Sequence, residues 1–462
     1  MCGIAGVAVS EGHRLGAAML PSMAETLRHR GPDDCGLWTS PAGDVSLAHR
    51  RLSIVDVSPL GRNPMGWSDG RFWITFNGEI YNHLELRAEL EAGGARFRSQ
   101  TDTEVILAAY ERWGTECVHR FVGMFAFALW DEARRRLWLV RDRLGKKPLY
   151  YAFRNGRLAF ASELKALLAD PSIGRDLDHA ALGIYLQCGY VPAPLTIYQS
   201  IRKLRPGHEA VYERGSLDVR RYWDPLAFVE QARTVDDADA SEELERRLGL
   251  AVSQRQIADV PLGAFLSGGI DSSLVVAMMR EHSSTPVRTF TIRFDNPQFD
   301  EADHAAAVAA HLGTDHHEDV CTSDDALAVA TRVPAMFDEP FADSSAIPTY
   351  LVSRAARAHV TVALSGDGGD ELFFGYPRYN HMASRGWALA LPAPVRQAAA
   401  MAVGLFPQRR MQRIADVLRR DDLDAYARFM HARSPSQVLA LTGTGPVPAP
   451  IYSETMKRLA GQ

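Results

Sequence analysis

The stretch Leu262-Gly-Ala-Phe-Leu-Ser-Gly-Gly-Ile-Asp-Ser-Ser273 decides the fold of the second half of the chain. Its apolar beginning predicts a short strand, Ser267 to Gly269 predict a tight turn, and the apolar spacing after Asp271 predicts a helix. Glycines let a backbone approach a ligand closely, and the N–H groups at the start of a helix attract an anion. The stretch therefore predicts a phosphate-binding loop between a strand and a helix.

The order of residues in this loop differs from two common phosphate-binding motifs. No lysine follows the glycines as it does in the Walker sequence, and there is no G-x-G-x-x-G. The loop resembles the pyrophosphate loop of the ATP pyrophosphatases, which split ATP between its α- and β-phosphates. A plain tight turn with serine caps is the structural alternative. The resemblance implies that ATP is bound by Ser267, Gly268, Gly269, Asp271, Ser272 and Ser273.

Short strands and helices alternate after this loop. We expect strands at 289–294, 317–320 and 360–364, with helices at 301–312, 324–337 and 347–359 between them. The alternation predicts a doubly wound parallel α/β sheet, whose ligands bind at the carboxyl ends of its strands. We expect Ile292, near one such end, to present backbone groups to an adenine ring. A second glycine-rich loop, 364–371, follows another strand.

Composition restricts the class of protein. The 462 residues suffice for two or three domains, and 51 basic against 56 acidic side chains give a net charge of -5. This balance favours neither a nucleic-acid polymer nor an anionic membrane surface as partner. The five cysteines form no C-x-x-C pair, and we find no signal peptide and no membrane span. We therefore expect a cytoplasmic protein that binds small molecules.

The second residue of the chain is a cysteine that opens a predicted strand. If Met1 is removed, Cys2 carries a free α-amine with a pKa of about 7.7–8.0, far below the value of about 10.4 for lysine. Such an amine is a suitable base for its own thiol, so one residue supplies both nucleophile and base. The alternative interpretation is that a cysteine at this position, taken alone, has no catalytic role and is incidental.

Four further motifs follow in the first 104 residues: Arg28-His-Arg-Gly-Pro-Asp33, Ala48-His-Arg-Arg-Leu-Ser-Ile-Val-Asp56, Phe76-Asn-Gly-Glu-Ile-Tyr-Asn-His83 and Thr101-Asp-Thr-Glu104. Together with Cys2 they resemble the class II glutamine amidotransferase domain. The resemblance implies an Ntn-type four-layer αββα domain. In this domain Cys2 would hydrolyse glutamine to glutamate and ammonia.

The same resemblance implies a role for each motif residue. Arg51 would clamp the glutamine α-carboxylate, while Asp102 and Glu79 would hold its α-ammonium end. The Asn77 side chain and the Gly78 N–H would stabilise the oxyanion that forms when Cys2 attacks. The structural alternatives are a hairpin turn for Asn77-Gly78 and surface charges for Arg51 and Asp102.

The loop Leu364-Ser-Gly-Asp-Gly-Gly-Asp-Glu371, with Phe373-Phe-Gly-Tyr376 and Asp338-Glu-Pro-Phe-Ala-Asp-Ser-Ser345, resembles the synthetase domain of glutamine-hydrolysing asparagine synthetases. The resemblance implies that Ser365 and Gly366 contact ATP and that Asp367 acts on aspartate or its adenylate. Some family members have a glutamate, whose side chain is longer, at the position of Asp367. Mg²⁺ prefers oxygen ligands, and we expect Asp271 and Asp370 to hold it together with the ATP phosphates.

These motifs predict three parts: a glutaminase domain at 2–225, a linker at 226–242 and an ATP-pyrophosphatase-type synthetase domain at 243–462. The resemblance ends near residue 382, after which we expect a helical, unassigned tail. Asparagine synthetases continue further and carry a lysine in that segment, whereas only Lys457 follows Lys203 here. The resemblance therefore implies a shortened chain, or a cation that another group or chain supplies.

Our hypothesis is a glutamine-dependent asparagine synthetase. Ammonia released at Cys2 would attack a β-aspartyl-AMP made from aspartate and MgATP, giving asparagine, glutamate, AMP and pyrophosphate. One alternative is an amidotransferase for another carboxylate in a specialised pathway. Another is a synthetase-inactive remnant with a nucleotide-binding scaffold or regulatory role. The expected partners are glutamine, aspartate and ATP, with neither nucleic acid nor membrane, and the sequence leaves a homodimer open.

Overall fold

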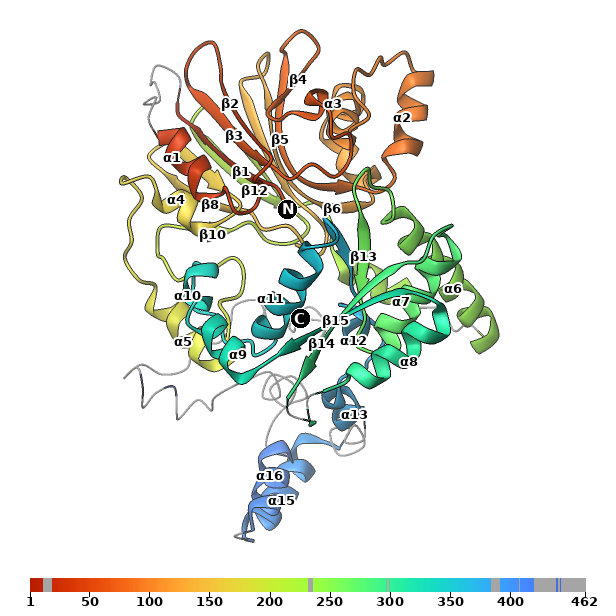
Figure 1. The fold of residues 1–462 in the computed structure, drawn as a ribbon. Helices are drawn as coiled ribbons and strands as arrows, with labels where there is room; N and C mark the ends of the chain where they lie inside the picture. Colours follow the sequence, from red (N-terminus) through yellow and green to blue (C-terminus); the bar gives the residue numbers. More distant parts are fainter. Residues whose placement is uncertain are drawn as a thin grey trace.

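The computed structural model describes residues 1–10, 19–231, 236–295, 297, 298, 300–383, 391–406, 408–418, 438 and 441. The first half of the chain contains two six-stranded sheets, in which the paired strands are antiparallel (Figure 1). One has the order β10 (Arg202–Lys203), β8 (Tyr150–Arg154), β9 (Arg157–Ala161), β1 (Gly3–Ala8), β3 (Val45–Arg51), β2 (Asp34–Thr39). The other has the order β12 (Ser216–Arg221), β11 (His208–Glu213), β7 (Arg136–Arg141), β6 (Gly123–Asp131), β5 (Phe72–Ile80), β4 (Met65–Trp67).

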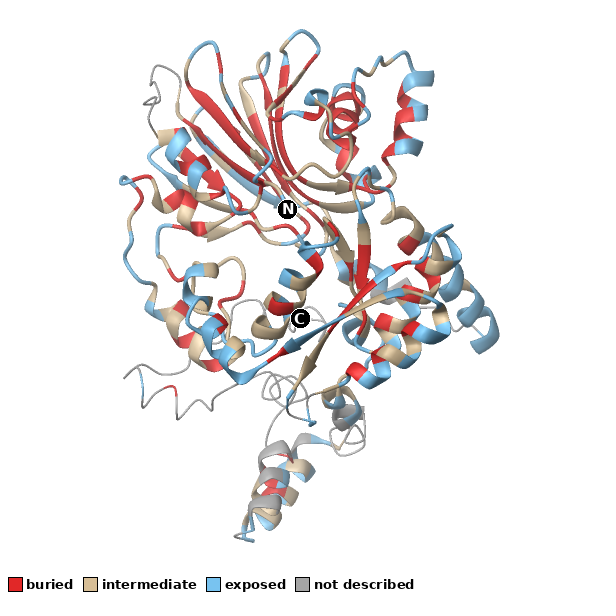
Figure 2. Ribbon diagram, in the orientation of Figure 1, coloured by how far each residue is buried: buried red, intermediate tan, exposed pale blue. Residues whose placement is uncertain are grey.

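Three buried clusters separate four layers in this half, and its strands are mostly buried (Figure 2). One cluster packs the first sheet against α1 (Met19–Thr26) and α4 (Leu164–Leu168). A second lies between the two sheets. The third packs the second sheet against α2 (His83–Ala92) and α3 (Asp102–Trp113). This is the αββα order that the sequence predicts. The connections of this half also contain η1 (Pro59–Gly61), η2 (Gly114–Arg120) and α5 (His179–Cys188).

Strand β6 shows how the sequence produces two cores at once. Phe125, Phe127 and Leu129 belong to the cluster under α2 and α3, whereas Ala126, Ala128 and Trp130 belong to the cluster between the sheets. Successive residues of a strand point to opposite faces, so a continuous apolar run packs on both. All six side chains are at most 2% exposed. Strand β6 therefore contributes to the cores on both faces of its sheet.

The second half contains a four-stranded parallel sheet with the order β15 (Asp315–Cys321), β14 (Arg288–Phe294), β13 (Leu262–Phe265), β16 (Val362–Leu364). On one face it packs against α6 (Asp237–Gln254), α7 (Ile270–Glu281) and α8 (Ala302–Leu312). On the other face Phe265 and Phe290 pack against α11 (Ala346–Arg357). Helices on both faces confirm the predicted doubly wound sheet.

Two expected boundaries differ from the observed ones. The single helix expected at 324–337 is divided into α9 (Ser323–Ala330) and α10 (Val333–Met336), because Pro334 suits the first turn of a new helix. The predicted linker, 226–242, contains most of η3 (Pro225–Gln231) and the first turns of α6. Its acidic residues suit a helix start, where Asp236 accepts a hydrogen bond from Ala238 N at 3.1 Å.

Helices continue after β16, as the predicted helical tail requires. They are α12 (Gly369–Leu372), α13 (Pro377–Ala383), α15 (Ala393–Gly404) and α16 (Arg409–Leu418), and the last two extend away from the rest of the molecule (Figure 1). Lys457 lies outside the described residues. Within the described part of the chain, no helix is both long and apolar enough to cross a membrane.

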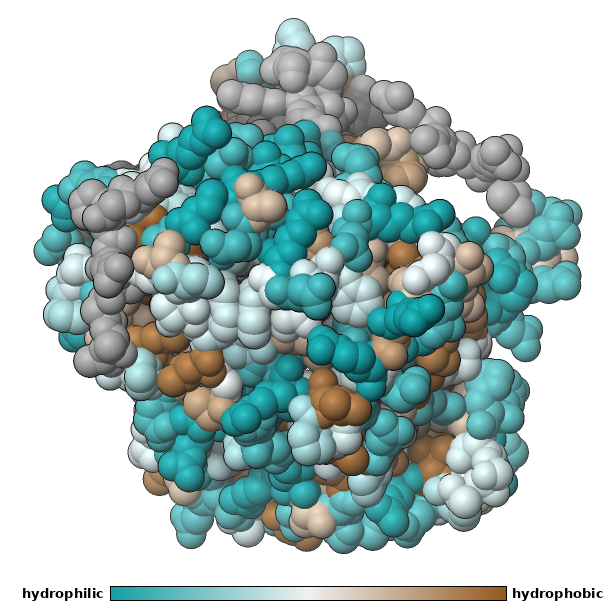
Figure 3. All heavy atoms as spheres, turned by 90° about the horizontal axis from the view of Figure 1, so that it is seen from above, coloured by the Kyte–Doolittle hydropathy of each residue, from teal (hydrophilic) through white to brown (hydrophobic). Residues whose placement is uncertain are grey.

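Partly buried ion pairs join the two halves. Lys165 Nζ lies 3.1 Å from Asp338 Oδ1, and the other oxygen of Asp338 accepts a hydrogen bond from Lys165 N at 2.9 Å. The next residue, Glu339, pairs with Lys203. Charges this little exposed must be paired to be tolerated, so these contacts fix the orientation of one half against the other. Viewed from above, the surface is mainly hydrophilic, with hydrophobic side chains in small separate groups (Figure 3).

Candidate active site

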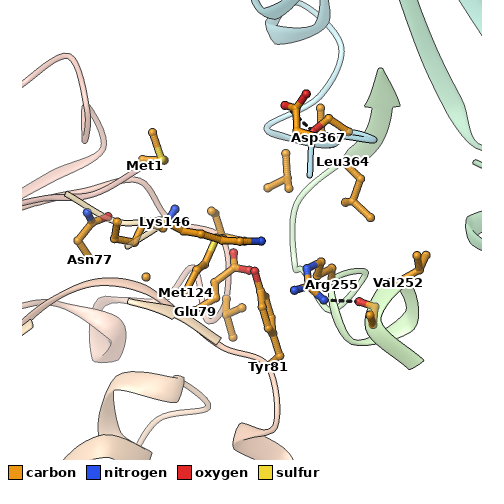
Figure 4. Close-up of a pocket in the computed structure, with 18 of the residues that line it drawn as sticks. Met1, Asn77, Glu79, Tyr81, Met124, Lys146, Val252, Arg255, Leu364 and Asp367 are labelled. Atoms are coloured by element: carbon orange, nitrogen blue, oxygen red, sulfur yellow. Dashed lines mark hydrogen bonds between the residues drawn. The ribbon is translucent and has the colours of Figure 1, made fainter. Parts of the chain in front are cut away.

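A cavity of about 900 Å³ lies between the two halves and contains residues from both. Met1 and Asn77 lie at its glutaminase end, and Leu364 and Asp367 lie across from them (Figure 4). Ten of the predicted site residues line it: Cys2, Arg51, Asn77, Gly78, Glu79, Asp102, Asp271, Ser365, Gly366 and Asp367. Seven others do not: Ser267, Gly268, Gly269, Ser272, Ser273, Ile292 and Asp370.

Cys2 directly precedes β1, and its backbone is held by a neighbouring ion pair. Arg30 Nε donates to the Cys2 carbonyl at 2.9 Å, and Arg30 Nη1 lies 2.8 Å from Glu163. Burial favours the neutral form of Glu163, but hydrogen bonds from His29 and Arg30 lower its pKa to about 2. Glu163 therefore stays charged at neutral pH and keeps Arg30 in place under Cys2.

The thiol and the amine at the chain start are both affected by burial. Cys2 Sγ lies 3.7 Å from the carbonyl oxygen of Leu52, and burial raises the pKa of the thiol. Burial also lowers the pKa of the Met1 α-amine to about 5, which leaves it unprotonated at neutral pH. This end of the cavity therefore favours a neutral thiol beside a neutral amine.

Asn77 and Gly78 lie inside β5, paired with β6, so the hairpin-turn alternative is wrong. Asn77 is 1% exposed, and neither of its amide atoms has a hydrogen-bond partner among the described residues. A buried amide without a partner is costly and rare. A Cβ on Gly78 would lie 2.2 Å from the Met124 carbonyl oxygen, so only glycine fits there. Asn77 is thus an unused polar group on the cavity wall.

Arg51 and Asp102 are buried, each 7% exposed, so the surface-charge alternative is also wrong. Arg51 donates from Nη1 to Ser58 O at 3.0 Å and from Nη2 to Asp56 O at 2.5 Å. Asp102 begins α3, where its Oδ2 accepts from Ile80 N at 2.9 Å. Strand and helix ends therefore present a guanidinium and a carboxylate to one cavity.

Two acidic groups in this end have raised pKa values. Burial and, to a smaller extent, the nearby Asp102 carboxylate together raise the pKa of Glu79 to about 7. Burial likewise raises the pKa of Asp102 to about 6. Lys147, 5% exposed, lowers the pKa of Glu79 but does not offset these effects. Two adjacent acids with raised pKa values form a site that a bound cation would stabilise.

The loop between β13 and α7 is ordered by its own serines. Ser272 Oγ accepts from Ser267 N at 3.2 Å and lies 3.0 Å from Ser267 Oγ. Gly268 has φ 80°, and a Cβ there would lie 2.6 Å from Ala305 N in α8. Only glycine meets both conditions. The predicted strand, turn and helix are all observed here.

The second glycine-rich loop lies directly against the first. A Cβ on Gly366 would lie 2.8 Å from Ser272 N, and one on Gly369 would lie 2.2 Å from Asp271 Oδ2. Ser365 Oγ donates to Asp367 Oδ2 at 3.0 Å. Asp367 is exposed on this loop, and Asp370 is exposed in α12, which follows it. The loops at 267–273 and 365–371 therefore meet at the carboxyl ends of β13 and β16.

Asp271 reaches the segment that carries Asp370, which fits an oxygen-ligated cation shared with phosphates. No group of three or more metal-ligating side chains occurs among the residues that the structure describes. Ile292 lies within β14, and its side chain packs against the cluster formed with α9 and α11. It is thus placed apart from the cavity wall.

The cavity residues that the sequence analysis did not predict include Lys147, Tyr81 and Arg255. Arg255 follows α6 in the synthetase half, and its guanidinium lies 4.2 Å over the Tyr81 ring of the glutaminase half (Figure 4). Tyr81 lies in the quoted motif 76–83, which marks the region but not this contact. No local sequence motif marks Arg255, because its partner Tyr81 is distant in sequence.

Comparisons with known proteins agree with this division. A glutamine amidotransferase domain model matches residues 1–223, and an asparagine synthase model matches residues 243–449. The second match continues past residue 382, where the recognisable motifs end.

Three relatives illustrate the range of similar proteins. A Mycobacterium tuberculosis protein, named putative asparagine synthetase (glutamine-hydrolysing), is 37% identical over 98% of this chain and 74% of its own length. Asparagine synthetase (glutamine-hydrolysing) 1 of Bacillus subtilis is 38% identical over 82% of this chain and 59% of its own length. An amidase of Gibberella zeae is 32% identical over 82% of this chain and 60% of its own.

A solved amidotransferase from Bacillus subtilis, which acts with glutamine and phosphoribosylpyrophosphate, has a TM-score of 0.38 and 14% identity. It covers 69% of this chain and 81% of its own, and this weak likeness has no part in the assignment. The chain belongs to the family of glutamine-hydrolysing asparagine synthetases, which are ATP-dependent ligases with glutamine as nitrogen donor.

Proposed function

We propose that this protein makes asparagine from aspartate, MgATP and glutamine. Glutamine hydrolysis at Cys2 gives glutamate and ammonia, and the synthetase half converts aspartate and ATP to β-aspartyl-AMP and pyrophosphate. Ammonia then displaces AMP to give asparagine. The observation that carries the proposal is the single cavity lined by Cys2, by Asp271 of the first synthetase loop and by residues 365–369 of the second.

Glutamine fits the glutaminase end through both of its charged groups. The Arg51 guanidinium would bind the α-carboxylate, and Glu79 and Asp102 would bind the α-ammonium. A bound ammonium would relieve the repulsion between the two acids that raises the pKa of Glu79. The side-chain amide of glutamine would then lie near Cys2, with the free Asn77 amide and the Gly78 N–H as donors to the oxyanion.

The α-amine is the base in this proposal, which requires removal of Met1. The α-amine would then belong to Cys2, in surroundings whose burial lowers the pKa of the Met1 amine. An unprotonated amine can accept the thiol proton, and the thiolate attacks the amide carbon. The protonated amine then supplies the proton that the leaving ammonia needs.

ATP would bind with its pyrophosphate on the loop 267–273 and the N-terminus of α7. Asp271 and Asp370 would hold Mg²⁺, which neutralises phosphate charge and favours departure of pyrophosphate. Ser365 and Gly366 would contact the nucleotide, and Ile292 would present backbone groups to the adenine. Asp367, exposed on the cavity wall, would face aspartate or its adenylate.

Pyrophosphate release with MgATP and ammonia, measured with and without aspartate, tests the synthetase half. Ammonia bypasses Cys2, so the assay is independent of the glutaminase. We expect pyrophosphate release that depends on aspartate and yields asparagine in equal amount. Absence of release with aspartate would contradict the proposal.

A second candidate function is amide formation on a different carboxylate. The similarity to a Gibberella zeae protein favours it, because that relative is similar in sequence but is named an amidase and not an asparagine synthetase. The same assay distinguishes the two candidates. Pyrophosphate release that begins only when another carboxylic acid replaces aspartate would support the second.

A further inference from the structure

Asp56 connects the two parts of the glutaminase end that face a glutamine ligand. Its carbonyl accepts from Arg51 Nη2 at 2.5 Å. Its Oδ2 accepts from Gln100 N at 2.8 Å, two residues before Asp102. Its Oδ1 accepts from Ser58 N at 3.1 Å. The position of Asp56 therefore determines where Arg51 and the start of α3 lie relative to each other.

The backbone of Asp56 is in a conformation that needs support. Its φ is 52°, in the left-handed region that few residues other than glycine, asparagine and aspartate adopt. The segment 52–58 has no strand or helix of its own to fix it. Contacts from outside the segment must therefore select this conformation.

A residue of the synthetase half supplies two of these contacts. Asp259 N donates to Ile54 O at 2.9 Å, and Asp259 Oδ2 accepts from Asp56 N at 2.7 Å. Asp259 lies between α6 and β13, and two residues later Pro261 O accepts from Thr361 N at 2.9 Å, beside β16. The contact is therefore anchored in the parallel sheet that carries both synthetase loops.

We propose that Asp259 is a positioning residue of the glutaminase, acting through Asp56 on Arg51 and on the start of α3. This inference rests on the proposed glutamine binding by Arg51 and Asp102. Asp259 does not line the cavity, so it acts on glutamine only through the segment 54–58. The synthetase half thus completes the glutamine site of the other half.

Loss of the Asp259 carboxylate should weaken glutamine binding and leave the ammonia route intact. The bond to Asp56 is exposed, so its loss should have a moderate effect. We expect Asp259→Ala to raise the KM for glutamine about three- to tenfold, with kcat and the KM for ammonia changed less than twofold. Asp259→Asn keeps an oxygen that can accept from Asp56 N, and should restore most of the glutamine KM.

The experiment compares the wild-type protein, Asp259→Ala, Asp259→Asn and the control Asp239→Ala, an exposed acid of α6. Each is assayed for glutamate release and for pyrophosphate release with glutamine or ammonia as donor. An unchanged glutamine KM in Asp259→Ala overturns the inference, as does an equal loss with both nitrogen donors. An Asp259→Asn variant as impaired as Asp259→Ala overturns the role of the accepted hydrogen bond.

The wild-type arm separates this inference from the proposed function. If the wild-type protein shows no glutamine hydrolysis that depends on Cys2, the proposed function is overturned, and this inference with it. Wild-type hydrolysis with an unaffected Asp259→Ala variant would overturn the inference alone. Thermal unfolding of each variant shows whether a change in KM reflects loss of folded protein.

Discussion

The two ends of the cavity are built in different ways. In the glutaminase end, Arg51, Asn77 and Asp102 are 7%, 1% and 7% exposed and lie on strands or at a helix start. In the synthetase end, Asp367 is exposed on a glycine-rich loop. The first end is therefore held in place by the fold itself, whereas Asp367 in the second is open to solvent. A substitution in the first end should therefore remove a side chain that the fold already holds in position.

The largest expected effect separates the two ends completely. Cys2→Ala removes the nucleophile, so glutamate release should fall by at least about 10³-fold. Pyrophosphate release with ammonia should remain, because that route does not use Cys2. Glutamate release at the wild-type rate in Cys2→Ala would remove Cys2 from the mechanism.

Asn77→Ala tests whether the glutaminase end is arranged in advance. Loss of one oxyanion donor should lower kcat for glutamine hydrolysis by about 10²–10³-fold. The KM for glutamine should change much less, because Asn77 does not contact the charged groups of the ligand in our proposal. Steady-state glutamate release gives both constants. A change confined to KM would show that Asn77 binds the ground state only.

Asp271→Asn is the matching test in the synthetase end. Removal of one metal-ligand charge should lower pyrophosphate release by about 10²-fold, while glutamine hydrolysis remains. Asp324→Asn, at an exposed position of α9, is the control for a charge change in the same half. A fully active Asp271→Asn variant would refute the proposed metal ligand.

A smaller effect is expected from pH. Burial raises the pKa of Glu79 to about 7 and that of Asp102 to about 6. Each raised pKa favours the folded protein at acidic pH, and this contribution is lost as pH rises through 6 and 7. A glutamine ammonium needs the charged forms, so the glutamine KM should rise about tenfold from pH 8 to pH 6.

Glu79→Gln checks this pH dependence, because it removes the group with the higher pKa. The variant should have a flatter glutamine KM profile between pH 6 and pH 8. Glutamate release at several pH values gives the profile. An unchanged slope would mean that Glu79 does not contact the α-ammonium.

The sequence predicts the separate elements well because their signals are local. The turn at Ser267–Gly269, the alternating strands and the order of the motifs were sufficient for both fold types and for ten residues of the cavity wall. The sequence predicts a linker where α6 begins, because acidic residues suit both a solvated segment and the first turn of a helix.

The contacts between the halves could not be predicted in the same way. Arg255 over Tyr81, Lys165 with Asp338 and Asp259 with Asp56 join residues far apart in the chain. No periodicity or short motif marks such pairs, since they exist only once both halves are folded and docked. The sequence alone could not exclude the hairpin-turn alternative for Asn77, because only the pairing of β5 with β6 excludes it.

The central claim is that one cavity carries ammonia from Cys2 to an aspartyl adenylate. The most direct test supplies glutamine labelled with ¹⁵N in its side-chain amide, together with aspartate, MgATP and an excess of unlabelled ammonium. We expect asparagine whose new amide nitrogen comes mainly from glutamine. Asparagine labelled only in proportion to the mixed ammonia pool, or no asparagine at all, would contradict it.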